Sequence, residues 1–150
     1  MQVKQLCWED VKENDAIEPV EFPLPVYRLI MFAGGMRDFN SLHHNPDVAR
    51  QRGAPDMFVN NTALFVMWER AVRNYIGLAG TITNVRGFRM GTFNTVGETL
   101  KVSGHVTRKW QDAESPGKGS VELSVQTDSS KGVTVGPGTI VVTLPCRGAA

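Results

Sequence analysis

Apolar and polar residues alternate along three stretches in the second half of the chain. Residues 100–106, 121–125 and 140–144 each place leucine, valine or isoleucine at nearly every second position. Strict alternation is typical of strands with one buried face. Ile82 to Met90 is a plausible fourth strand. The connections Gln111 to Gly119 and Ser129 to Gly132 carry the glycine, proline, aspartate and serine expected of hairpin loops.

A different period marks the middle of the chain, where Asn60 to Gly77 is predicted to be the one long helix. Its apolar residues recur at helical spacing and share one face: Leu64, Trp68, Ala71 and Tyr75. Asn60 or Asn61 can cap the first turn, and Gly77 and Gly80 offer the left-handed conformation that ends a helix.

The first third of the chain gives weaker signals. Ala16 to Leu24 resembles a short strand, but its prolines restrict it to an edge strand or an irregular segment. Val26 to Gly34 is apolar enough to be buried. Pro46 is well placed to open a short helix at Asp47.

These elements predict an α+β fold. A long apolar helix followed by antiparallel strands must bury the helix against one sheet face, because neither element can cover its apolar side alone. That is the hot-dog architecture, a central helix wrapped by an antiparallel sheet of about five strands. We expect residues 1–150 to form a single such domain, with 1–15 a candidate for a loosely packed N-terminal segment.

Charge and cysteine content narrow the choice of function. Lysine and arginine number 16 and aspartate and glutamate 15, a balance that does not favour nucleic acid or an anionic membrane surface as a partner. Cys7 and Cys146 lack metal-site spacing, and we interpret them as free thiols in a reducing compartment. Met1 to Asp15 has no signal-like apolar run, and no run of about 18 apolar residues occurs. The expected location is cytoplasmic.

The chemically informative stretch is 37–46, at the boundary of a loop and a short helix. Asp38 and His43 lie five positions apart across a predicted turn, so they can converge on one small molecule such as water. A carboxylate and an imidazole together can orient a water, take its proton and return a proton to a neighbouring carbon. Addition of water across a double bond requires these steps.

This stretch resembles the hydratase motif of the MaoC-like dehydratases and (R)-specific enoyl-CoA hydratases, Asp-x-Asn-Pro-x-His. Asp38, Asn40 and His43 match the motif, whereas Ser41 replaces the usual proline and Asn45 a common aspartate. The resemblance implies an enoyl-CoA hydratase that converts a trans-2-enoyl-CoA to a 3-hydroxyacyl-CoA. No bound cofactor is expected, because coenzyme A is part of the substrate.

A longer match points to one branch of that family. Arg37 to His44, followed by Asp56 to Asn60, is similar to the small MaoC-like subunit of actinobacterial steroid side-chain hydratases. This similarity implies a heterotetramer with a second, hot-dog-containing subunit, and a steroid side-chain CoA thioester as substrate. A homodimer is the alternative, since hot-dog sheets pair their edges across a two-fold axis.

By the same resemblance, Asp38 and His43 are catalytic and share the water, while Asn40 helps hold the loop at the substrate. The backbone amide of Asn61, at the N-terminus of the central helix, is the candidate donor to the thioester oxygen. Independently of the family, Arg86 and Arg89 are candidates to meet the phosphates of coenzyme A.

Two other functions stay open. Glu69 on the central helix can serve a hot-dog thioesterase, although a surface salt bridge to Arg73 four residues later is the favoured interpretation. Alternatively, the chain is a non-catalytic subunit that shapes a partner's acyl pocket. The His43–His44 pair lacks the cysteine or second carboxylate set of a metal site, so no metal is predicted.

Overall fold

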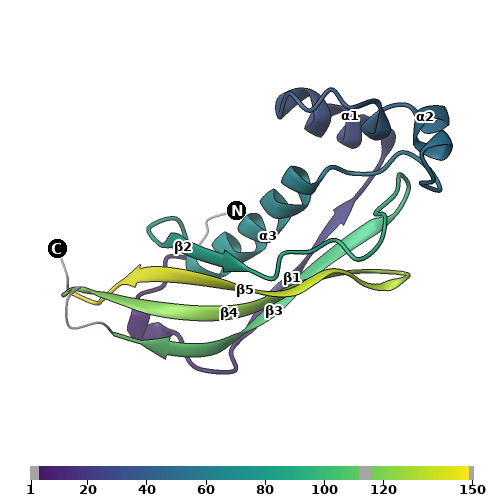
Figure 1. Ribbon diagram of the computed structural model, residues 1–150. Coiled ribbons are helices and arrows are strands. Elements are labelled where there is room, and N and C mark those ends of the chain that lie inside the picture. Colours follow the sequence, from purple (N-terminus) through teal and green to yellow (C-terminus); the bar gives the residue numbers. More distant parts are fainter. Residues whose placement is uncertain (1–3, 112–115, 149–150) are drawn as a thin grey trace.

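The computed structural model describes residues 4–111 and 116–148, and in this part five antiparallel strands form one sheet that curves along a long helix (Figure 1). The strands follow the order β1-β3-β4-β5-β2 across the sheet. They are β1 (Ala16–Pro23), β2 (Thr81–Arg86), β3 (Thr99–Trp110), β4 (Lys118–Ser129) and β5 (Gly132–Pro145). The helices are α1 (Val26–Gly35), α2 (Pro46–Gln51) and α3 (Asn61–Ile76), with single 3-10 turns η1 (Trp8–Asp10) and η2 (Ser41–His43). The predicted hot-dog arrangement of helix and sheet is confirmed.

The two ends of α3 are fixed by residues that the sequence indicated. The side chain of Asn60 accepts a hydrogen bond from the backbone N–H of Ala63 at 2.9 Å, so Asn60 is the N-cap. Gly77 ends the helix with a φ of 88°, and a Cβ there would overlap Gln5. Gly80 does not adopt a positive φ, contrary to expectation.

The apolar face of α3 packs against the sheet as predicted. Leu64, Trp68 and Ala71 are fully buried, whereas Tyr75 is half-buried. The indole N–H of Trp68 donates to Thr127 Oγ1 at 2.8 Å inside the core. Full burial of each large side chain contributes about 1.5–3 kcal/mol, so this face holds α3 in place against β1, β3 and β4.

The strands agree with the predicted alternation, with two local differences at the sheet edges. β1 is an edge strand, as its prolines required, and its register shifts between Ile17 and Val20. β2 ends at Arg86, four residues before the predicted end, because Gly87 turns the chain with a φ of 68°. Met90 rejoins the sheet only as an isolated bridge to Val135.

The prediction that 26–34 is buried is wrong. The segment forms α1, and only Leu29 and Ala33 are buried. The reason is geometric: α1 lies beyond the N-terminal end of α3 (Figure 1), so only one of its faces meets the rest of the domain. Its opposite side exposes a group of large apolar residues: Val26 (50%), Tyr27 (60%), Ile30 (47%) and Met31 (68%).

Most residues of the N-terminal segment are exposed over its described part, 4–15, but two of them anchor it to the rest of the domain. Val11 is 1% exposed, and the indole N–H of Trp8 donates to the backbone oxygen of Ser120 at 3.3 Å. Of the predicted loop 111–119, residues 112–115 lie outside the described residues, and the last two residues belong to β4. The glycine-rich stretch 132–138 forms the start of β5.

Candidate active site

Asp38 is positioned by the turn that ends α1. Its backbone N–H donates to the carbonyl of Ala33 at 2.9 Å, and that of Arg37 to Gly34 at 3.1 Å. Arg37 adopts a φ of 54°, a conformation that side-chain-bearing residues seldom occupy. The helix end therefore turns the chain abruptly just before the carboxylate.

The 3-10 turn η2 carries His43, and Asn40 caps it. Asn40 Oδ1 accepts from the backbone N–H of Leu42 at 3.2 Å, and the carbonyl of Asn40 accepts from the N–H of His43 at 3.1 Å. Asn40 is itself exposed. The expectation that it holds the loop agrees with these contacts, while contact with substrate stays a prediction.

His43 is buried, at 8% exposure, and its ring is fixed by a backbone group. Nδ1 lies 2.8 Å from the carbonyl oxygen of Phe58. Because a carbonyl only accepts, Nδ1 must carry a proton, so the lone pair of the neutral ring is on Nε2. The Phe58 ring packs edge-on against the imidazole at a centroid distance of 5.1 Å.

Nε2 of His43 faces the carboxylate of Asp38. The distance from Nε2 to Oδ2 is 3.3 Å, and the Asp38 side chain is 36% exposed. The structure thus brings together the two residues that the motif singled out. One small molecule in front of them can contact both groups, with the imidazole on the protein side and the carboxylate toward solvent.

Asn60, predicted as a helix cap, also contacts the candidate pair. Its Nδ2 donates to Asp38 Oδ2 at 3.0 Å while its Oδ1 caps α3. Asn60 is 4% exposed, so the donor has little access to water. The cap prediction held a clue, since an asparagine that caps with its oxygen keeps two N–H groups for another acceptor.

The N-terminus of α3 also offers free backbone donors. Of the first amides, Ala63 donates to the Asn60 side chain and Leu64 to the Asn60 carbonyl. Those of Asn61 and Thr62 have no acceptor among the hydrogen bonds of 4–111 and 116–148. Such N–H groups, with the positive end of the helix dipole, favour a developing negative charge.

The remaining predicted residues lie in other surroundings. Arg86 pairs with Thr139, next to the pairing of Val85 with fully buried Ile140, so Arg86 lies on the sheet face away from α3. There its Nη2 is 3.5 Å from Glu122 Oε2. Arg89 is exposed in the loop after β2, and a role of either arginine toward coenzyme A stays a prediction.

Glu69 forms the predicted salt bridge, with Oε1 2.9 Å from Arg73 Nε. Cys7 and Cys146 are free thiols. The described residues contain no cluster of histidine, cysteine or carboxylate side chains that could hold a metal ion. Within the same residues, none of the helices is long and apolar enough to cross a membrane.

No protein-family model matches the sequence, and no curated protein matches it. Solved structures do match: the MaoC-like dehydratase from Rhodospirillum rubrum has a TM-score of 0.82 at 18% identity, over 95% of this chain and 98% of that chain. The chain has the hot-dog fold of the MaoC-like dehydratases.

Two further structures are similar to this hot-dog chain. The (R)-hydratase from A. caviae involved in PHA biosynthesis has a TM-score of 0.75 at 19% identity, over 91% of this chain and 99% of that chain. A chain of the ChsH1–ChsH2 complex from Mycobacterium tuberculosis has a TM-score of 0.74 at 25% identity, over 91% of this chain and 98% of that chain. The fold therefore matches the family that the motif at Asp38 to His43 resembles.

Proposed function

We propose that this chain is an enoyl-CoA hydratase that adds water across the double bond of a trans-2-enoyl-CoA. The observation that carries the proposal is the contact of His43 Nε2 with Asp38 Oδ2 at 3.3 Å, with each partner oriented from behind. The Phe58 carbonyl fixes the imidazole and Asn60 fixes the carboxylate. Two groups held this way can position one water for attack.

The Phe58 carbonyl keeps a proton on Nδ1, so Nε2 of the neutral ring can act as the base. His43 Nε2 accepts a proton from water as the water oxygen forms a bond to the β-carbon. The imidazolium that results is stabilised by the carboxylate of Asp38. The pair then returns one proton to the α-carbon, so the product contains the elements of water and the two side chains regain their starting state.

Charge that develops on the thioester oxygen needs donors, and the N-terminus of α3 can supply them. We assign this role to the backbone amides of Asn61 and Thr62, which lie beside the cap residue that binds Asp38. Preorganised donors of this kind are each worth about 10²–10³ in rate in other enzymes. Coenzyme A belongs to the substrate, and we propose no resident cofactor.

The same proposal extends to substrate and assembly. The similar chain from Mycobacterium tuberculosis is part of a two-protein complex, which supports a heteromeric assembly. From the resemblance of the motif, we further propose that the second subunit contains a hot-dog domain and that the substrate is a steroid side-chain CoA thioester. Both outer strands, β1 and β2, have an edge without a partner strand in the described chain. Such edges can pair with a strand of another chain. The free thiols of Cys7 and Cys146 favour a reducing, cytoplasmic location.

The test follows the loss of conjugated enoyl-thioester absorbance with crotonyl-CoA, for the chain alone and with any co-encoded hot-dog partner. We expect Asp38→Asn and His43→Gln each to lower kcat/KM by about 10²–10⁴-fold, while Glu69→Gln retains activity. Free thiol release that depends on Glu69 would replace hydration by thioester hydrolysis. If neither Asp38→Asn nor His43→Gln changes the activity, the chain would be a non-catalytic subunit.

A further inference from the structure

The Phe58 carbonyl that fixes His43 belongs to a short extended segment, 57–59. Two backbone hydrogen bonds, both 3.0 Å long, join this segment to the loop between β2 and β3: Val59 N–H to the Asn94 carbonyl, and Val96 N–H to the Met57 carbonyl. Between these bonds, Phe58 and Thr95 face each other as an isolated antiparallel bridge. In such a pair the N–H and C=O groups point away from the partner. The loop therefore sets where the Phe58 carbonyl lies, on the side that faces His43.

Glu98 and Lys131 brace this loop, which we define as 92–98. One carboxylate oxygen of Glu98, Oε1, accepts from the N–H of Thr95 at 3.3 Å and from its hydroxyl at 2.5 Å. Lys131 lies in the turn between β4 and β5, and its Nζ donates to the same oxygen and to the Phe93 carbonyl, the latter at 3.1 Å. A single side chain thus ties the β4–β5 hairpin to two points of the loop.

Aromatic side chains connect the same loop to the imidazole. The rings of Phe93 and Phe58 lie 4.8 Å apart between centroids, and the Phe58 ring packs edge-on against His43. Because Lys131 holds the backbone of Phe93, the hairpin constrains the imidazole by a second route. The hairpin and the loop lie at the end of the sheet that carries α1 and α2 (Figure 1), the two helices that flank Asp38 and His43 in the chain.

Glu98 keeps its charge although most of its side chain is buried. The side chain is 14% exposed, and within 4–111 and 116–148 its Oε2 is buried without a hydrogen-bond partner. Burial opposes the charge, but hydrogen bonds, that from Lys131 foremost, keep the pKa of Glu98 below its ordinary value. An ion pair of this kind often adds little net stability relative to apolar residues of similar size. Its hydrogen bonds, however, hold the loop in one conformation.

We propose that Glu98 and Lys131 are positioning residues for His43. Their ion pair fixes the loop 92–98, the loop fixes the Phe58 carbonyl, and the carbonyl holds Nδ1 of the imidazole so that Nε2 faces the carboxylate of the catalytic pair. Both residues act on the ring through other groups. This inference rests on the proposed hydratase function for its effect on the rate, whereas its effect on the orientation of the ring does not depend on any reaction.

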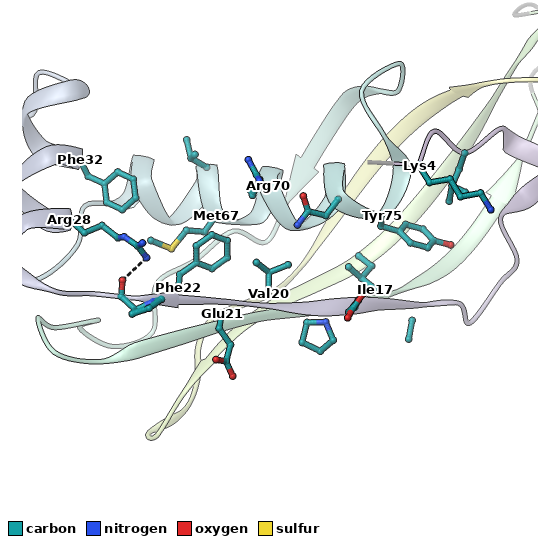
Figure 2. A pocket seen from close by; sticks show the side chains of 17 residues that line it. Lys4, Ile17, Val20, Glu21, Phe22, Arg28, Phe32, Met67, Arg70 and Tyr75 are labelled. Atoms are coloured by element: carbon teal, nitrogen blue, oxygen red, sulfur yellow. Dashed lines mark hydrogen bonds between the residues drawn. The ribbon is translucent and has the colours of Figure 1, made fainter. Parts of the chain in front are cut away.

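The first experiment breaks the ion pair from either side. Lys131→Met and Glu98→Gln should each lower kcat for crotonyl-CoA by about 10- to 100-fold, because a misplaced catalytic group reduces the rate. KM should change by no more than about twofold, since substrate binding is not altered. Neither residue lines the cavity between β1 and α3 (Figure 2), so both substitutions leave that lining intact. Lys131→Arg keeps donors for both acceptors and should retain kcat within about threefold.

Arg73→Met is the matched control. Arg73 makes the same two kinds of contact at the C-terminal end of α3, to the carboxylate of Glu69 at 2.9 Å and to the Gly80 carbonyl at 3.1 Å. Its loss should leave kcat unchanged, and urea unfolding compares the stability of the variants. An equal fall of kcat in Arg73→Met and Lys131→Met would indicate general destabilisation and overturn the inference.

Nitrogen NMR of the imidazole rings tests the same inference without activity. The two tautomers of the neutral ring, with the proton on Nδ1 or on Nε2, have different nitrogen shifts. The spectrum of His43→Gln identifies the signals of His43. In the wild type and in Arg73→Met, the neutral ring should be in the Nδ1–H form alone, whereas Lys131→Met should show a mixture of both forms.

The outcomes separate this inference from the proposed reaction. An unchanged kcat and an unchanged tautomer in Lys131→Met would overturn the positioning role, while an active wild type keeps the hydratase function. A higher KM with unchanged kcat would assign Lys131 to substrate binding and would also overturn the positioning role. Mixed tautomers in Lys131→Met, with a wild type that does not hydrate crotonyl-CoA, would refute the reaction while the positioning role stands.

Discussion

Asn60→Ser should separate the capping of α3 from the orientation of Asp38. Asn60 does both, through Oδ1 to the Ala63 amide at 2.9 Å and Nδ2 to Asp38 Oδ2 at 3.0 Å. Serine is an equally good N-cap, but its hydroxyl is too short to reach the carboxylate as well. A hydrogen bond to a charged group is worth about 1.5–3 kcal/mol, so kcat/KM should fall by about 10- to 100-fold with little change in unfolding free energy.

Two further substitutions of Asn60 complete this experiment. Asn60→Ala removes both contacts and should in addition destabilise the fold by about 1 kcal/mol. Asn60→Asp keeps a capping oxygen but places a second carboxylate beside that of Asp38, and repulsion between the two should lower kcat/KM at least as much as Asn60→Ser does. Urea unfolding and crotonyl-CoA kinetics measure the two effects separately. Full activity in Asn60→Ser would refute the positioning role.

Three further predictions follow from other contacts. Thr127→Val leaves the Trp68 indole N–H buried without an acceptor and should cost about 1–3 kcal/mol in urea unfolding. Burial alone would raise the pKa of Glu98, but hydrogen bonds, that from Lys131 foremost, hold it below its ordinary 4.5. The corresponding stability is present above pH 4.5 and is lost as pH falls through the lower folded pKa, so Glu98→Gln should flatten the acid side of the stability profile. Asn40→Ala removes the cap of η2 and should lower kcat by about tenfold through a looser His43.

Each of these three predictions has its own control. Asn45 caps α2 by accepting from the amides of Asp47 and Val48, so Asn45→Ala tests whether loss of a neighbouring cap alone reduces activity; equal losses would contradict a specific role of Asn40. Adding Trp68→Phe to Thr127→Val should remove the unpaired donor, and strict additivity would argue against their coupling. An unchanged acid transition in Glu98→Gln would contradict the sign of its pKa shift.

The sequence predicted those parts of the fold that depend on local pattern. Alternation identified three strands, and helical spacing with Asn60 and Gly77 gave the bounds of α3 within one residue. The error at α1 has a physical origin: apolar composition indicates that a segment tends to be buried, but only the packing decides which face is covered. β2 was overextended because Gly87 interrupts a pattern that otherwise continues.

For the candidate site, too, the sequence predicted only some of the residues. Asp38 and His43 were found because they lie in one short motif. The two groups that orient them were not: the Phe58 contact is made by a backbone carbonyl, which no side-chain pattern reveals, and the second contact of Asn60 spans 22 positions in the chain. The cavity between β1 and α3 also could not be predicted, since it depends on the distance between an edge strand and a helix that are far apart in the sequence.

The most direct test of the central claim is to run the reaction in heavy-oxygen water and analyse the products by mass spectrometry. Hydration by Asp38 and His43 predicts that crotonyl-CoA becomes an intact 3-hydroxy thioester with one heavy oxygen in its alcohol, and that both Asp38→Asn and His43→Gln abolish this product. Heavy oxygen in a free carboxylic acid, released together with coenzyme A, would contradict the account and identify a thioester hydrolase.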